Sequence, residues 1–140
     1  MKRFFMNPGN LTGVASVGVL VLRLVSGVLM LYLHGWPKWT KFSAKADSFP
    51  DPLGVGPPVS MALTIFAEVG CSALIVLGAF TRWAAFVLMF TMVIAAFVIH
   101  GEDPLRKQEL ALIYAAVFAG LVFTGAGRIS IDNALGMKSD

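Results

Sequence analysis

Residues that carry redox, metal or nucleophilic chemistry are scarce in this sequence of 140 residues. It contains one cysteine, Cys71, and two histidines, so it has no Cys-x-x-Cys pair and cannot close a disulfide within the chain. It also lacks a glycine-rich phosphate loop, a nucleophile elbow and a haem-attachment motif. We therefore expect no intrinsic cofactor, and any redox chemistry would depend on a bound carrier or on a partner.

Charged residues are few as well, at 14% of the chain, whereas 57% of the residues are hydrophobic and the mean hydropathy is +0.78. A soluble domain of this length could not remove so much apolar surface from water. The net charge of +3 is not gathered in a basic block, so nothing indicates binding to nucleic acid. The composition predicts a single integral membrane domain, residues 1–140, whose first partner is the lipid bilayer.

Long apolar segments provide the spans of this domain. A helix needs about 20 residues to cross a bilayer at 1.5 Å per residue, and backbone groups in lipid must be satisfied within the helix. Four segments qualify: roughly 13–34, 59–80, 83–100 and 107–124. The fold class predicted is therefore all-α, an integral membrane bundle of four transmembrane helices. The connection 35–58 holds five of the seven prolines, which predicts a turn-rich, non-helical loop.

The orientation of the four spans is less clearly encoded. Both termini lie on one side, and apart from Arg23 each side of the membrane carries five basic residues. Four acidic residues lie on the side of the long loop: Asp47, Asp51, Glu102 and Asp103. They favour cytoplasmic termini in a bacterial cytoplasmic (inner) membrane, although acidic residues weigh little in this rule.

Two opposite charges fall near the middle of the first two spans, Arg23 and Glu68. Each would cost roughly 2.5–3.5 kcal/mol at the centre of an isolated membrane helix. Equal depth and opposite sign therefore predict an intramembrane ion pair, Arg23–Glu68. Two interpretations stay open: the pair fixes the register of two helices, or it lines a ligand or proton site.

A second polar group lies at the loop-side ends of the spans, where His34, His100 and Glu109 are expected at similar depth. Helical spacing predicts inward faces on three spans. These faces comprise Arg23, Gly27, Met30 and His34; Thr64, Glu68, Cys71 and Ser72; and Glu109, Ala116 and Gly120. Together they predict a polar pocket that opens toward the long loop. Two histidines and a glutamate could also hold a metal, but both histidines precede glycine at helix ends, which favours binding of terminal carbonyls, and we predict no metal site.

Several short motifs in this order resemble the DoxX family of small four-helix membrane proteins. They are Arg23, "HGWPK" (34–38), "FAEVG" (66–70), "LGAFTRWAA" (77–85), "HG" (100–101), "ELALIY" (109–114) and "GAGRISID" (125–132). Each is weak alone, and together they span nearly the whole chain. The chain departs from the family pattern at Cys71, where a second glycine is common, and at Ile129, where an aromatic residue is common.

The resemblance implies a membrane subunit linked to redox systems such as thiosulfate:quinone oxidoreductase or complexes that handle oxidative stress. The residues that match its polar motif are Arg23, His34, Lys38, Glu68, His100 and Glu109. We expect the pocket to bind a quinone-like molecule and to relay protons, with electrons supplied by a redox partner protein. Whether the chain is itself an enzyme stays open, because it has no self-contained catalytic motif. The alternatives are a non-catalytic accessory or assembly subunit of a larger membrane complex, or a small-molecule carrier. The chain could also associate with copies of itself as a homo-oligomer.

Overall fold

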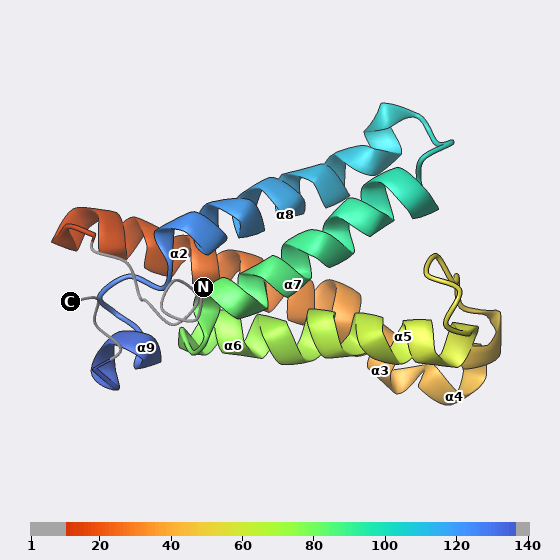
Figure 1. Cartoon of the computed structure of the whole chain (residues 1–140), viewed down its shortest axis with the longest axis horizontal. Coiled ribbons are helices and arrows are strands. Elements are labelled where there is room, and N and C mark those ends of the chain that lie inside the picture. The colour runs from red at the N-terminus through yellow and green to blue at the C-terminus, as the bar shows by residue number, and fades with distance from the viewer. Residues whose placement is uncertain (1–10, 137–140) are drawn as a thin grey trace.

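The computed structural model describes residues 11–136. All regular structure in this part of the chain is helical, and four helices are long and apolar enough to cross a membrane (Figure 1). They run over Gly13–Thr40, Pro57–Leu77, Thr81–Ile99 and Leu105–Thr124. The predicted fold class, an all-α membrane bundle of four helices, is confirmed.

Three of the four long helices combine α-helical and π-helical stretches. The first contains α2 (Gly13–Leu29), η1 (Met30–Gly35) and α3 (Trp36–Thr40). The second contains α5 (Pro57–Ile65), η3 (Phe66–Cys71) and α6 (Ser72–Leu77). The third contains α7 (Thr81–Ile94) and η4 (Ala95–Ile99), and the fourth is α8 (Leu105–Thr124). Short helices follow the first and fourth: α4 (Phe42–Lys45), the single turn η2 (Ala46–Ser48) and α9 (Ile131–Ala134).

The first helix is longer than the sequence predicted. It continues to Thr40 instead of ending at residue 34, and most of residues 41–48 are helical as well. The prediction of a non-helical loop over 35–58 is therefore wrong for its first half. Pro37 indicates a break, but it closely follows the π-helical stretch η1 within one continuous helix. Local π-helical adjustment is one way in which membrane helices accommodate a proline.

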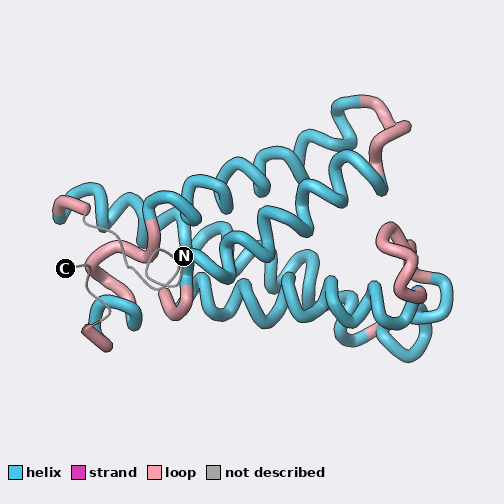
Figure 2. The backbone as a smooth tube through the Cα atoms, viewed as in Figure 1, coloured by secondary structure: helices cyan, strands magenta, loops and turns pink. Residues whose placement is uncertain are grey.

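Loops gather at the two ends of the bundle (Figure 2). The start of α2 and the helix α9 lie at one end, together with the turn between α6 and α7 (Figure 1). Residues 49–56 and the link between η4 and α8 lie at the other end. From the α6–α7 turn, α7 diverges from the second helix toward this loop end (Figure 1).

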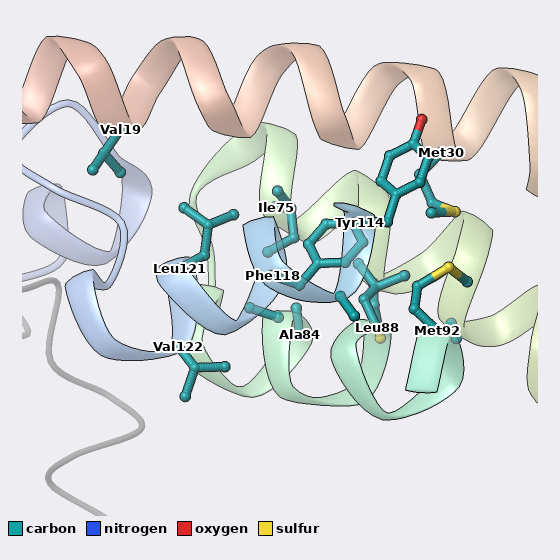
Figure 3. Close-up of a cluster of buried hydrophobic side chains, with 14 residues drawn as sticks. Val19, Met30, Ile75, Ala84, Leu88, Met92, Tyr114, Phe118, Leu121 and Val122 are labelled. Atoms are coloured by element: carbon teal, nitrogen blue, oxygen red, sulfur yellow. The ribbon is translucent and has the colours of Figure 1, made fainter. Parts of the chain in front are cut away.

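The bundle core combines a few large side chains with many small ones. Met30, Ile75, Leu88 and Phe118 are fully buried, and Tyr114 stacks on Phe118 with ring centroids 5.9 Å apart (Figure 3). Lipid tails are as apolar as these side chains, so close packing, more than exclusion of water, holds membrane helices together. Small buried residues permit that close approach: Ala67, Cys71, Ala84, Ala85 and Ala96.

Arg23 joins three parts of the chain. The residue is 1% exposed, and its guanidinium donates from Nε to the carbonyl of Ile75 (2.9 Å) and from Nη2 to that of Val76 (3.0 Å). Nη1 donates to the carbonyls of Ala126 and Ile129, both at 2.8 Å. Carbonyls in the last turn of a helix lack partners within that helix, and they attract a cation. Arg23 therefore caps the C-terminal end of α6 and links residues 126–129 to α2.

The predicted ion pair between Arg23 and Glu68 does not form. Glu68 lies against Gly35 of the first helix. Gly35 is 12 residues beyond Arg23, which is about 18 Å at 1.5 Å per residue. Equal depth was inferred by ending the first span at residue 34, and the true end at Thr40 shifts the register of the two helices.

Asp51 anchors the proline-containing loop 49–56 at the start of α5. Its Oδ1 accepts from the Ser60 hydroxyl (2.6 Å) and from the amide of Val55 (3.1 Å), and its Oδ2 accepts from the amide of Gly56 (2.8 Å). The Ser60 hydroxyl, followed by backbone amides, lowers the pKa of Asp51 below its ordinary value. The ionised carboxylate thus holds the loop against the first turn of α5 through these hydrogen bonds.

Replacing Arg23 with methionine should reduce the free energy of unfolding by about 3 kcal/mol or more. The substitution keeps an apolar chain of similar length but leaves four carbonyl acceptors without their charged donor. Thermal unfolding in detergent, followed by circular dichroism, measures the loss. The matched control is Arg106→Met at the exposed start of α8, which should shift stability by less than about 0.5 kcal/mol. Equal shifts would contradict this account of Arg23.

Replacing Asp51 with alanine should raise amide hydrogen exchange at Val55 and Gly56 about tenfold, because both amides lose their acceptor. The exposed Asp47 provides the control variant Asp47→Ala, which should leave both rates unchanged. In the unmodified chain the pKa of Asp51 is below its unfolded value of about 3.9. The hydrogen bonds of the Asp51 carboxylate are therefore fully present above about pH 3.9 and are lost as the pH falls through the lowered pKa. If the amides of Val55 and Gly56 stay protected from exchange in Asp51→Ala, Asp51 does not hold this loop.

Candidate functional site

Two of the three π-helical stretches in the described residues, η1 and η3, pack directly against each other. A Cβ atom at Gly35 would lie 2.8 Å from the carbonyl oxygen of Glu68 and 2.7 Å from Cγ2 of Val69. Only glycine allows this approach of one backbone to another without a shift of the helices. Single π-helical turns are frequent at functional sites. The contact places the motifs "HGWPK" and "FAEVG" at one level of the bundle.

Lys38, one turn beyond Gly35, provides the cation for Glu68. Its Nζ donates to Oε2 of Glu68 at 2.6 Å and to the carbonyl of His34 at 3.3 Å. The Glu68 side chain is 5% exposed and that of Lys38 is 28% exposed. A carboxylate at this depth needs a charge partner. The resemblance had grouped Lys38 with the pocket, but helix counting alone had assigned the partner to Arg23.

A cavity of about 480 Å³ lies beside this ion pair. Its walls come from loop residues 49–53 and from α5, η3, α7 and η4, at the end where α7 diverges from the second helix (Figure 1). Apolar side chains form most of its lining. The polar exceptions are Lys38, Ser60, Thr64, Glu68, Thr91 and His100. An apolar cavity of this size with a few convergent polar groups is typical of a small-molecule site.

His100 lines the cavity and is linked to the polar connection before α8. Its Nδ1 lies 2.8 Å from Oδ2 of Asp103, and Lys107 donates to Oδ1 of the same carboxylate at 2.9 Å. The His100 and Lys107 hydrogen bonds lower the pKa of Asp103 below its ordinary value. An ionised Asp103 only accepts, so Nδ1 of His100 is the donor and Nε2 is the ring nitrogen left for a ligand or water.

Only three of the six residues predicted for the pocket lie together in the structure. Lys38, Glu68 and His100 line one cavity. Arg23 lies at the other end of the bundle, and His34 packs edge-on against Tyr114 between the first and fourth helices, with ring centroids 5.6 Å apart. Glu109 is exposed. The predicted single pocket of all six residues is therefore corrected to a site of three.

The face predicted for the fourth span is also wrong. Glu109, Ala116 and Gly120 are all exposed. The buried face carries Tyr114, Phe118 and Leu121 instead, at the same helical spacing. Small residues indicate a packing surface by the sequence alone, but α8 packs its aromatic side chains Tyr114 and Phe118 against the other helices.

Two parts of the site were missed from the sequence. Asp103 follows His100 by three residues and precedes Lys107 by four, a spacing that could have indicated the hydrogen-bonded set. The loop residues Phe49, Pro50, Pro52 and Leu53 had no signal beyond their proline content. Within residues 11–136 no three His, Cys, Asp or Glu side chains lie close enough to hold a metal ion.

Replacing Gly35 with alanine should destabilise the bundle by about 1–3 kcal/mol, because the new methyl group would collide with backbone of η3. The control is Gly120→Ala on α8, where a Cβ meets nothing within 4 Å. That variant should be neutral, or up to about 1 kcal/mol more stable through helix propensity. Thermal unfolding of both variants in one detergent makes the comparison. A Gly35 variant as stable as the Gly120 variant would refute the close approach.

Comparison with known proteins gives one family and two relatives. The DoxX profile matches residues 18–101. An uncharacterized protein of Haemophilus influenzae is 36% identical over 119 residues, which cover 80% of this chain and 86% of the relative. A second uncharacterized protein of the same organism is 26% identical over 139 residues, covering 93% of this chain and 91% of the relative. No solved structure matches the chain.

The family match falls on the helices that build the site. Residues 18–101 include η1, Lys38, η3 and the lining of the cavity as far as His100. The match covers more than half of the chain, and the first relative exceeds 30% identity over most of it. The chain therefore belongs to the DoxX family and is a multi-pass membrane protein.

Proposed function

We propose that this chain is a redox-associated membrane subunit that binds a quinone-like small molecule beside the Lys38–Glu68 pair. The observation that carries the proposal is an apolar cavity of about 480 Å³ with an ion pair in its wall. A quinone has polar ring oxygens and an apolar tail, and the two kinds of surface in the cavity are complementary to these two parts.

The cavity is continuous with the outer surface of the helices, which supports a ligand taken from the bilayer. Leu63, Phe66, Phe90 and Ile99 line it, and each is 40–50% exposed. In a membrane this outer surface meets lipid tails. A lipid-soluble ligand can therefore enter between the second and third helices, with its tail along these side chains and its head toward Lys38.

The polar residues of the site suit proton exchange with such a head. Reduction of a quinone to a quinol takes up two electrons and two protons. Lys38 donates a hydrogen bond to a ring oxygen, and the carboxylate of Glu68 accepts or returns a proton. The His100 side chain is 40% exposed and connects the cavity with water through Asp103. A redox partner protein in the bacterial cytoplasmic membrane, or docked on it, supplies the electrons.

Ala95→Phe should weaken ligand binding at least about tenfold, because the ring fills space that the ligand head or tail occupies. The measurement is quenching of tryptophan fluorescence by decyl-benzoquinone added to purified chain in detergent. Ala116→Phe is the matched control: it adds the same ring to an exposed position on α8 outside the cavity and should bind as the unmodified chain does.

The same titration can reject the proposal. If the unmodified chain does not bind the quinone, or if Ala95→Phe binds it equally well, the cavity is not a quinone site. Absence of binding together with a stoichiometric membrane partner on purification would instead support the accessory-subunit alternative.

A further inference from the structure

We infer that the cavity selects the reduced, hydroxyl-bearing form of its ligand, a quinol over a quinone, through an unused donor on Lys38 beside an unused acceptor on Glu68. The inference rests on the proposed function and adds to it the redox form that the site holds best. It depends on how many hydrogen bonds each partner of the ion pair has left to make.

Lys38 retains one donor. An ammonium group has three N–H donors and no acceptor. Two of them are used within the described residues, for Oε2 of Glu68 and for the carbonyl of His34. Lys38 lines the cavity and its side chain is 28% exposed, so the third donor is accessible to a ligand there.

Glu68 retains one acceptor. Oε2 accepts from Lys38, whereas Oε1 has no hydrogen-bond partner among residues 11–136. Oε1 is also not sealed inside protein, because the buried side-chain atoms without a partner in this part of the chain are the hydroxyls of Ser72 and Thr81. Glu68 lines the cavity, so its free oxygen is available from the same space as the free donor of Lys38.

A hydroxyl group satisfies both at once. It donates its O–H to Oε1 of Glu68 while its oxygen accepts from Nζ of Lys38. A quinone carbonyl can accept from Lys38 but has no hydrogen to give, so it leaves Oε1 facing another acceptor. Sites built to hydrogen-bond a hydroxyl discriminate strongly against an analogue that lacks it, because their own buried polar atom is left unpaired.

Preference for the quinol has a consequence for the bound redox couple. By thermodynamic linkage, each tenfold tighter binding of the two-electron-reduced form raises the potential of the bound couple by about 30 mV. Bound quinone is then easier to reduce than quinone free in the membrane. The site thereby stabilises the quinol, which forms when the redox partner delivers electrons to the bound quinone.

Three ligands that share one decyl tail test the inference on the unmodified full chain in detergent. They are decyl-benzoquinone, its quinol kept reduced under anaerobic conditions, and the dimethyl ether of that quinol. The ether keeps the ring and the oxygen acceptors but has no O–H donor. We expect the quinol to bind about tenfold more tightly than the quinone and than the ether, since one charge-assisted hydrogen bond distinguishes them.

Glu68→Gln tests the residue. The glutamine amide presents a donor in place of the free carboxylate oxygen, so the ratio of quinol to quinone affinity should fall to about one or below. Glu109→Gln removes an exposed carboxylate outside the cavity and should keep the tenfold ratio.

The outcomes separate the two proposals. Binding of all three ligands with equal affinity overturns selection of the quinol and leaves the quinone site standing. An unchanged ratio in Glu68→Gln removes Glu68 as its cause. If none of the ligands binds, the proposed function itself fails. The comparison of ligands on the unmodified chain holds even if Glu68→Gln does not fold.

Discussion

A carboxylate inside a bilayer is costly unless it meets a positive charge, and the half of the bundle that contains the cavity is arranged around that constraint. Glu68 is nearly buried and meets Lys38 at 2.6 Å. The pair depends on the continuation of the first helix through η1 to Thr40 and on Gly35, which lets η1 lie against the backbone of η3. The pair lies in the wall of the cavity, so the contact that offsets the cost of a buried carboxylate also places two charged groups on the lining of a mostly apolar space.

Arg23, another buried charge of the spans, is satisfied in a different way. Within residues 11–136 it donates to four carbonyls and to no carboxylate. Gly78, which ends α6 with φ of +72°, leaves room beside the guanidinium that a Cβ would fill. The bundle therefore has one end at which Arg23 joins α2, α6 and residues 126–129, and another at which α7 diverges from the second helix (Figure 1). The cavity lies at the second of these ends.

The outcome of the individual predictions follows from the kind of signal each one used. The four spans were predictable because length and hydropathy are local properties of the chain. The predicted pairing of Arg23 with Glu68 was wrong because it depended on the relative depth of the two helices in the membrane. The first helix continues through a π-helical stretch and past a proline, so its residues lie at a different depth from the one counted along the sequence. The packing face predicted for α8 was wrong because small residues pack helices only where a neighbouring helix lies. Ala116 and Gly120 are exposed in the part of the chain that the structure describes.

By itself the sequence determined the class of fold, the presence of buried charges and the resemblance to the DoxX family, since all of these follow from composition and local motifs. Tertiary structure alone decided which charge meets which. It paired Lys38 with Glu68, separated His34 and Glu109 from His100, and brought loop residues 49–53 over the cavity. The physical reason is that a partner for a buried charge is chosen by distance in space. That distance depends on helix register and packing, which no local pattern in the chain records.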